Sequence, residues 1–132
     1  MITGIRFDQA EGIWPCIEGK IEKACSYSSA KYKKENILEW VKNRECQLWV
    51  SIYDYEVNAV AITQLINYPN GRSCYFMLTT GHDRELWQDD IKIIESWAKD
   101  NGCCCVEVVG RPGWEKVLKD YEKTHVFLVK DI

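Results

Sequence analysis

The sequence has no long apolar run, no basic cluster and no leader-like segment, and each absence narrows the function. None of its apolar segments is long enough to cross a membrane, and residues 1–15 carry Arg6, Asp8 and Glu11 where a signal peptide would be apolar. The formal net charge is −3 at pH 7. We therefore expect no binding to membranes or nucleic acid, because phosphate-rich partners require clustered Lys and Arg side chains.

Internal repeats, low-complexity tracts and Pro- or Ser-rich linkers are missing as well, which predicts a single domain over residues 1–132. The seven cysteines are an odd number with no leader before them, so we expect reduced thiols and a cytoplasmic protein. Cys103, Cys104 and Cys105 are adjacent, and neighbours in a strand point to opposite faces. This favours small side chains filling a central strand over a metal site.

Large aromatic side chains, by contrast, are abundant: the chain has six Trp and seven Tyr. A core of this size does not need so many, and some of them are expected to line a cleft or a contact surface. Exposed Trp residues would then anchor a homo-oligomer or a protein partner, such as a phage protein. The alternative is that they lie at the periphery of the core.

Apolar spacing and turn residues predict a chain of alternating helices and strands. Residues 47–53 and 57–66 are rich in β-branched and aromatic side chains, whereas Trp87, Ile91 and Ile94 recur at helical spacing. The expected elements are strands at 4–7, 47–53, 57–66, 73–80, 103–109 and 125–130, and helices at 12–25, 33–43, 85–101 and 114–121.

The order of these elements predicts the topology of the sheet. Three strands joined by short turns form an antiparallel meander, and the strand–helix–strand unit that follows makes strands 73–80 and 103–109 parallel. We therefore predict an α/β fold of the α+β type, with one mixed sheet of six to seven strands and helices on both faces.

This order resembles the fold of the GNAT family of N-acetyltransferases. The resemblance covers nearly the whole chain as topology and is strongest in sequence over GRPGWEKVL at 110–118. Together with QLWV at 47–50 and IESWAKDNGC at 94–103, this stretch is similar to small GNAT-like proteins encoded by bacteriophages and prophages.

The resemblance implies that acetyl-CoA lies between strands 73–80 and 103–109, with its pyrophosphate at the start of helix 85–101, where unpaired amides attract anions. The family's glycine-rich loop is reduced to Gly81, and Asp83 and Glu85 bring negative charge. We expect these acidic side chains to cap the helix in place of a phosphate. The residues implied to bind the cofactor are Leu78, Thr79, Thr80, Gly81 and Arg84.

For catalysis, the resemblance implies a tyrosine near the last helix as the general acid, and Tyr121 in YEK matches that context. The alternative is a tyrosine that finishes a helix. Glu107 is the candidate general base, or else a solvent-facing strand residue. Two functions stay open: a phage- or prophage-derived GNAT-like protein that is non-catalytic or atypical, and an acetyl-CoA-dependent N-acyltransferase acting on an unknown amine.

Overall fold

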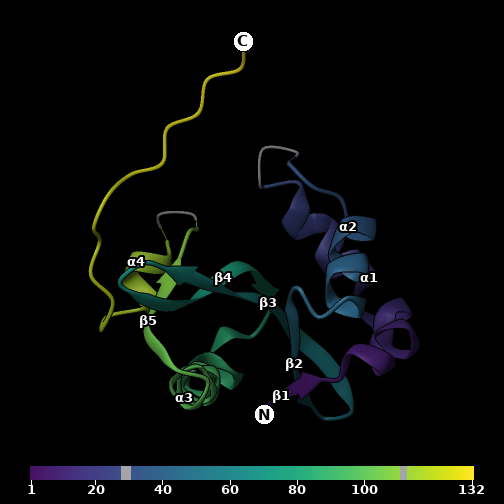
Figure 1. Ribbon diagram of the computed structural model, residues 1–132. Coiled ribbons are helices and arrows are strands. Elements are labelled where there is room, and N and C mark those ends of the chain that lie inside the picture. The colour runs from purple at the N-terminus through teal and green to yellow at the C-terminus, as the bar shows by residue number, and fades with distance from the viewer. Residues whose placement is uncertain (28–30, 111–112) are drawn as a thin grey trace.

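The computed structural model describes residues 1–27, 31–110 and 113–132. Its centre is a five-stranded sheet in the order β1-β2-β3-β4-β5, with helices on both faces (Figure 1). Neighbouring strands are antiparallel, except that β4 and β5 are parallel. This confirms the predicted mixed sheet with its meander and its single crossover. The strands are β1 (Ile2–Ile5), β2 (Gln47–Tyr53), β3 (Glu56–Tyr68), β4 (Gly71–Gly81) and β5 (Cys103–Val108).

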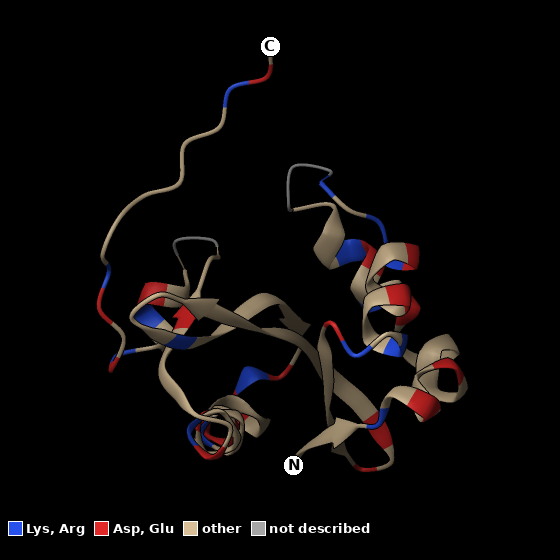
Figure 2. Cartoon of the chain, viewed as in Figure 1, with Lys and Arg blue, Asp and Glu red and all other residues tan. Residues whose placement is uncertain are grey.

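The helices pack on the sheet through apolar stripes. Ile17 and Ile21 are buried in the first helix, as are Ile91 and Ile94 in the third. Figure 2 shows that charged residues are frequent along the first two helices, whereas the strands carry few. In the part of the chain that the structure describes, no helix has the length and apolar content of a membrane span. The helices are α1 (Ala10–Cys25), α2 (Lys34–Lys42), α3 (Ile91–Asp100) and α4 (Trp114–Val117), and the short 3-10 turns are η1 (Phe7–Gln9), η2 (Arg84–Leu86) and η3 (Gln88–Asp90).

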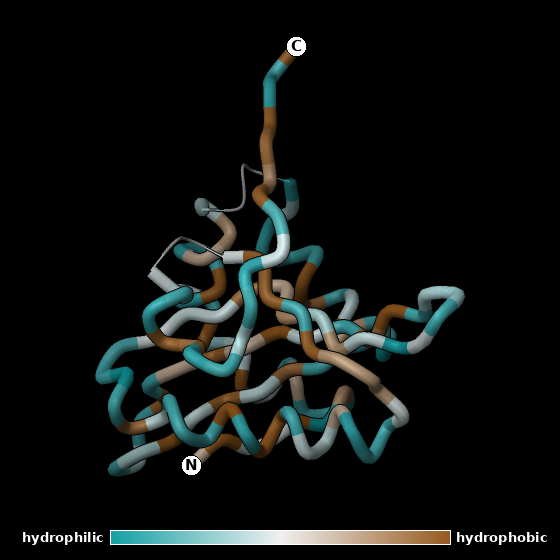
Figure 3. The backbone as a smooth tube through the Cα atoms, turned by 90° about the vertical axis from the view of Figure 1, so that its left-hand side faces the viewer, coloured by the Kyte–Doolittle hydropathy of each residue, from teal (hydrophilic) through white to brown (hydrophobic). Residues whose placement is uncertain are grey.

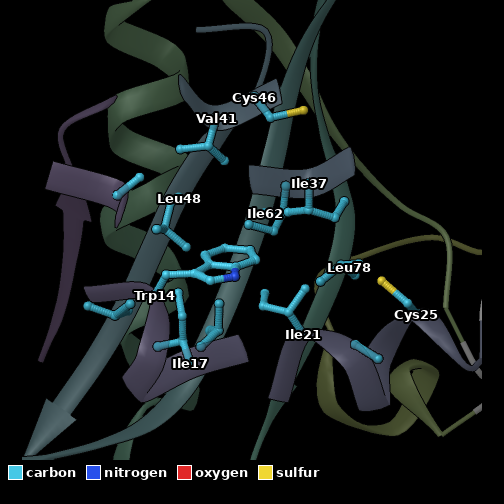
Figure 4. Close-up of a cluster of buried hydrophobic side chains, with 14 residues drawn as sticks. Trp14, Ile17, Ile21, Cys25, Ile37, Val41, Cys46, Leu48, Ile62 and Leu78 are labelled. Atoms are coloured by element: carbon cyan, nitrogen blue, oxygen red, sulfur yellow. The ribbon is translucent and has the colours of Figure 1, made fainter. Parts of the chain in front are cut away.

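Side chains that alternate along the strands divide the interior into two cores. Leu48 and Val50 belong to the cluster beneath α1 and α2, which we call the α1-side core (Figure 4). Trp49, between them in sequence, belongs to the cluster beneath α3, which we call the α3-side core. Each fully buried side chain of this size contributes about 1.5–3 kcal/mol. The centre of the sheet is therefore held from both faces.

None of the six tryptophans is exposed. Trp14, Trp49 and Trp87 are buried, and the remaining three are half-buried. No tryptophan therefore offers the exposed anchor that the composition led us to expect. The exposed apolar side chains lie mainly in loops and in the C-terminal segment.

The C-terminal third differs most from the prediction. Residues 125–130 form no strand, so the prediction of six to seven strands is wrong and the sheet has five. A strand needs a neighbour to pair its backbone, and none of the described strands lies beside this segment. It runs away from the sheet as an extended tail (Figure 1). In addition, α4 ends at Val117 and not at residue 121, and α3 begins at Ile91 and not at residue 85.

Candidate functional site

A bulge in β4 sets the geometry of the candidate site. The register with β3 shifts between Ile62 opposite Leu78 and Thr63 opposite Phe76, which leaves Met77 as an extra residue. Phe76 and Leu78 are two residues apart and would share a face in a regular strand. They lie instead in different cores, Phe76 on the α3 side and Leu78 on the α1 side.

Beyond the bulge, β4 and β5 part. β5 ends at Val108, opposite Phe76, so residues 77–81 of β4 have β3 on one side and no described strand on the other. Tyr32, between α1 and α2, donates its hydroxyl to the Met77 carbonyl at 3.4 Å. Four of the predicted cofactor-binding residues fall on this open stretch, namely Leu78, Thr79, Thr80 and Gly81. We use the name slot for the acetyl-CoA position that the resemblance implies between β4 and β5, and we call residues 77–81 with the end of β5 its strand half.

The turn from β4 to α3, residues 82–90, forms the other half of the slot, which we call the turn half. Two 3-10 turns, η2 and η3, replace the first turns of the expected helix. Their amides bond to nearby main-chain carbonyls: Leu86 N–H to Asp83 at 2.9 Å, Trp87 N–H to Arg84 at 3.1 Å, and Asp90 N–H to Trp87 at 3.0 Å. No side chain caps η2, η3 or α3, so the prediction of acidic caps is wrong. The residue before η2, Asp83, adopts a left-handed backbone with φ of 50°, so the chain turns into a 3-10 turn here and not into the first turn of α3.

Trp87 fills the space beneath the turn half. Its side chain is 4% exposed and belongs to the α3-side core. The indole N–H donates to the His82 carbonyl at 2.9 Å, and the ring lies 6.1 Å from that of Trp114, with 51° between the ring planes. A large side chain thus occupies the position at which a phosphate-binding turn carries small residues.

Close packing against β3 explains why position 81 is a glycine, without any ligand. A Cβ at this position would lie 2.6 Å from both the Ala59 Cβ and the Asn58 carbonyl oxygen. The next residue, His82, donates its N–H to the same Asn58 oxygen at 2.9 Å. The glycine lets β4 approach β3 at the end of the sheet, so packing alone explains why a side chain is not tolerated here.

The charges at the turn half are mainly negative. Asp83, Glu85 and Asp89 are exposed there. Asp90 lies 3.6 Å from the N-terminal ammonium, and His82 lies 3.7 Å from Asp83. Arg84, the predicted phosphate ligand, is exposed on η2 among these acids. An arriving diphosphate would therefore meet like charge.

Tyr121 lies after α4 and points to α3. Its hydroxyl donates to Glu95 at 2.5 Å. Burial and this hydrogen bond raise the pKa of Tyr121, so the phenol keeps its proton. The group therefore has a carboxylate partner on the α3 side of the sheet.

Glu107 lies on the other face. Cys74 belongs to the α3-side core, so its neighbour Tyr75 faces the α1 side, as does Glu107, which is opposite Tyr75 in β5. Glu107 accepts a hydrogen bond of 3.0 Å from Tyr68, and this bond raises the pKa of Tyr68. Tyr121 and Glu107 are thus on opposite faces, and the structure does not bring them together.

The three adjacent cysteines occupy an open strand and not a central one. The register shifts between Arg72 opposite Cys103 and Ser73 opposite Cys105, which leaves Cys104 unopposed. Cys104 and Cys105 are exposed, and β4 is the only strand beside β5 in the described chain, so the prediction of a central strand filled on both faces is wrong. Among residues 1–27, 31–110 and 113–132, no group of three or more His, Cys, Asp or Glu side chains is placed to hold a metal ion.

Sequence reasoning missed the bulge at Met77 and the partners Tyr32, Tyr68 and Glu95. Each acts through a contact between elements far apart in the chain, for which the sequence carries no local signal. Of the stretch GRPGWEKVL, Arg111 and Pro112 lie outside the described residues.

No protein-family profile matches the sequence, and no curated protein resembles it in sequence at a significant level. Solved structures nevertheless match its fold. A predicted acetyltransferase from Clostridium acetobutylicum, solved with acetyl-CoA, gives a TM-score of 0.69 at 12% identity, covering 99% of this chain and 95% of the other.

Two further acetyltransferases extend this likeness. An aminoglycoside acetyltransferase from an uncultured soil sample, in complex with sisomicin, gives a TM-score of 0.70 at 9% identity over 100% of this chain and 95% of the other. A ribosomal-protein-alanine N-acetyltransferase from Brucella melitensis gives 0.64 at 12% identity over 99% of each chain. At such identities the likeness shows the fold alone, and this chain has the GNAT fold.

Proposed function

We propose that this chain is a GNAT-fold protein that does not hold acetyl-CoA by its diphosphate and performs no conventional acyl transfer. Its fold serves protein binding instead. The observation that carries this proposal is the turn half of the slot, where Trp87 fills the interior and the amides of Leu86 and Trp87 already have main-chain partners. A diphosphate needs free amides and room for its oxygens.

The two halves of the slot fit acetyl-CoA unequally. In the strand half, residues 77–81 have a backbone edge without a strand neighbour, which is compatible with a pantetheine. In the turn half, bulk and negative charge oppose the diphosphate. Because the charged part of the ligand does not fit, we derive no reaction step through it.

The alternative function is an N-acyltransferase with an atypical cofactor site. The parting of β4 from β5 favours it, since an acyl thioester could reach the α1-side face near Glu107. In this alternative Glu107 is the base, Arg84 contacts phosphate and Tyr121 is the acid. Tyr121 would first have to leave Glu95. The relationship to phage and prophage proteins rests on sequence resemblance and stays a prediction.

Calorimetric titration of the full chain with acetyl-CoA and with S-acetylpantetheine, which lacks the diphosphate, tests the proposal. We expect no saturable heat from acetyl-CoA up to about 1 mM. A dissociation constant of 1 mM corresponds to a binding free energy of only about −4 kcal/mol, and the diphosphate should add nothing to it. Equal weak binding of both ligands would support the rejection of the diphosphate and would indicate binding through the pantetheine alone. Micromolar binding of acetyl-CoA, tighter than that of S-acetylpantetheine, would overturn the proposal.

A pair of variants makes the titration specific. Arg84→Gln removes the predicted phosphate contact, and Arg44→Gln removes an arginine that lies over the Phe7 ring, away from the slot. We expect both variants to match the parent chain. Weaker acetyl-CoA binding in Arg84→Gln alone would show that the turn half holds phosphate.

A further inference from the structure

The outer edge of β5 is open in the described chain. β5 pairs with β4 alone, so half of its backbone N–H and C=O groups face away from the sheet. Cys104 and Cys105 on this strand are exposed. An open edge of this kind is a template for another strand, and proteins usually cover or charge it.

Residues 125–130 have the composition of a strand without a strand partner. Val126 and Phe127 are each 63% exposed, Leu128 is 87% exposed and Val129 is 54% exposed. Figure 3 shows this apolar tail standing clear of the body of the molecule. One cation–π contact reaches it, with the Lys31 Nζ 4.1 Å from the centre of the Phe127 ring. Four consecutive exposed apolar side chains are typical of a protein–protein contact surface.

The tail and the edge are complementary in charge. Within residues 125–130 the ionisable side chains are His125 and Lys130, and there is no acid. Within β5 the only charged side chain is that of Glu107, and there is no base. Opposite charges on neighbouring strands stabilise their pairing, whereas like charges oppose it.

We propose that residues 125–130 of one copy pair with β5 of a second copy, and that the second copy's tail pairs reciprocally with the first. After α4 the tail runs away from its own β5 (Figure 1), which is the geometry that an exchanged arm requires. A two-fold arrangement closes both open edges at once and buries both tails. Each sheet then gains the strand that its own chain does not supply.

This exchange is independent of whether the slot binds acetyl-CoA. The surfaces involved are the outer edge of β5 and the tail, whereas the slot lies between β4 and β5. The exchange also supplies an apolar contact surface that the buried and half-buried tryptophans do not.

Size-exclusion chromatography with light scattering tests the partner. We expect the parent chain to be a dimer and Leu128→Lys to be a monomer, because the exchange buries the apolar Leu128 side chain and an ammonium group there would lose its hydration. Leu128 is exposed in the single chain, so the variant keeps its fold, which circular dichroism would verify. The matched control is Ile93→Lys, which changes an exposed isoleucine on α3 and should stay dimeric. A monomeric parent, or a dimeric Leu128→Lys, would overturn the exchange.

Disulfide trapping distinguishes pairing of the tail with β5 of a second copy from pairing with β5 of the same chain. In a background carrying Cys16→Ser and Cys104→Ser, Cys105 is the remaining exposed cysteine of the parent sequence. A second cysteine is introduced in turn at positions 126, 128 and 130, and the background without it is the control. We expect a covalent dimer on a non-reducing gel for at least one position. A disulfide confined to single chains, or none at any position, would contradict the proposal.

Discussion

The two halves of the slot differ in what they retain of the fold. In the strand half, the bulge at Met77 and the early end of β5 still separate two parallel strands. In the turn half, two 3-10 turns precede α3 and the buried Trp87 lies between them. The strand half follows from backbone register, which the whole sheet maintains. The turn half depends on a few side chains and can change without loss of the sheet, so the fold alone does not determine the activity.

The largest effect is expected from Trp87→Ala, because Trp87 anchors the turn half in the α3-side core. Loss of a buried tryptophan lowers the free energy of unfolding by about 3–5 kcal/mol. Urea denaturation followed by circular dichroism would measure it. A loss below about 1 kcal/mol is typical of a surface substitution. It would mean that the indole is not packed in the α3-side core and that the turn half has room for a ligand.

Gly81→Ala, at the junction of the two halves, should lower the free energy of unfolding by about 1–3 kcal/mol, since its Cβ would lie 2.6 Å from the Ala59 Cβ. The matched control is Gly19→Ala on the exposed side of α1, where an added Cβ has no neighbour within 4 Å. Alanine should stabilise that helix by about 0.5–1 kcal/mol. Effects of the same sign at both glycines would refute the packing role of Gly81.

Tyr121→Phe removes a hydrogen bond to Glu95 and should cost about 1–2 kcal/mol in the free energy of unfolding. Tyr68→Phe is the control, since the exposed bond from Tyr68 to Glu107 should contribute less. If Tyr121 instead serves chemistry in the slot, its substitution should leave stability unchanged and abolish acyl transfer. Paired measurements of denaturation and of thiol release from acetyl-CoA would show which holds.

The smallest effect concerns pH and the packing around the bulge. Burial raises the pKa of Cys46 to about 11, and the thiol lies 3.7 Å from the Met77 sulfur. Because the folded chain keeps this proton above the ordinary thiol pKa of 9.0, stability is retained below pH 9 and falls as the pH rises toward 11. The loss is about 1.4 kcal/mol per pH unit for one such group.

Denaturation of the parent chain and of Cys46→Ala between pH 7 and about pH 10.5 would isolate this contribution. The variant should start lower in stability but lose less with rising pH, so that the two curves converge. Parallel curves would show that the Cys46 thiol ionises as readily in the folded chain as in the unfolded one, and that the strand half is not closely packed there.

The sequence predicted those parts of the fold that short-range patterns determine. The run QLWVSIY predicted β2, and the spacing of Ile91, Ile94 and Ala98 predicted the buried stripe of α3. The order of elements was sufficient to place β4 parallel to β5. That the turn at Gly81 departs from a phosphate loop stays a prediction, and the acidic caps expected there do not form.

Features that depend on distant contacts could not be predicted. Nothing in the sequence around Met77 marks a bulge, because the bulge arises from pairing with β3. Residues 125–130 resemble a strand, yet a strand forms only beside a partner. The early start predicted for α3 failed because helical spacing continues through Trp87, whereas Asp83 begins a tighter 3-10 turn.

The most direct test of the account is a residue-resolved titration of the ¹⁵N-labelled chain with acetyl-CoA by nuclear magnetic resonance. The backbone amides of residues 77–81 report on the strand half, and those of residues 82–90 report on the turn half. We expect the signals of Leu86 and Trp87 to stay unchanged at every ligand concentration, because their N–H groups already donate to the main chain. Saturable shifts of these two amides at micromolar acetyl-CoA would contradict the account, since the turn half would then hold the diphosphate.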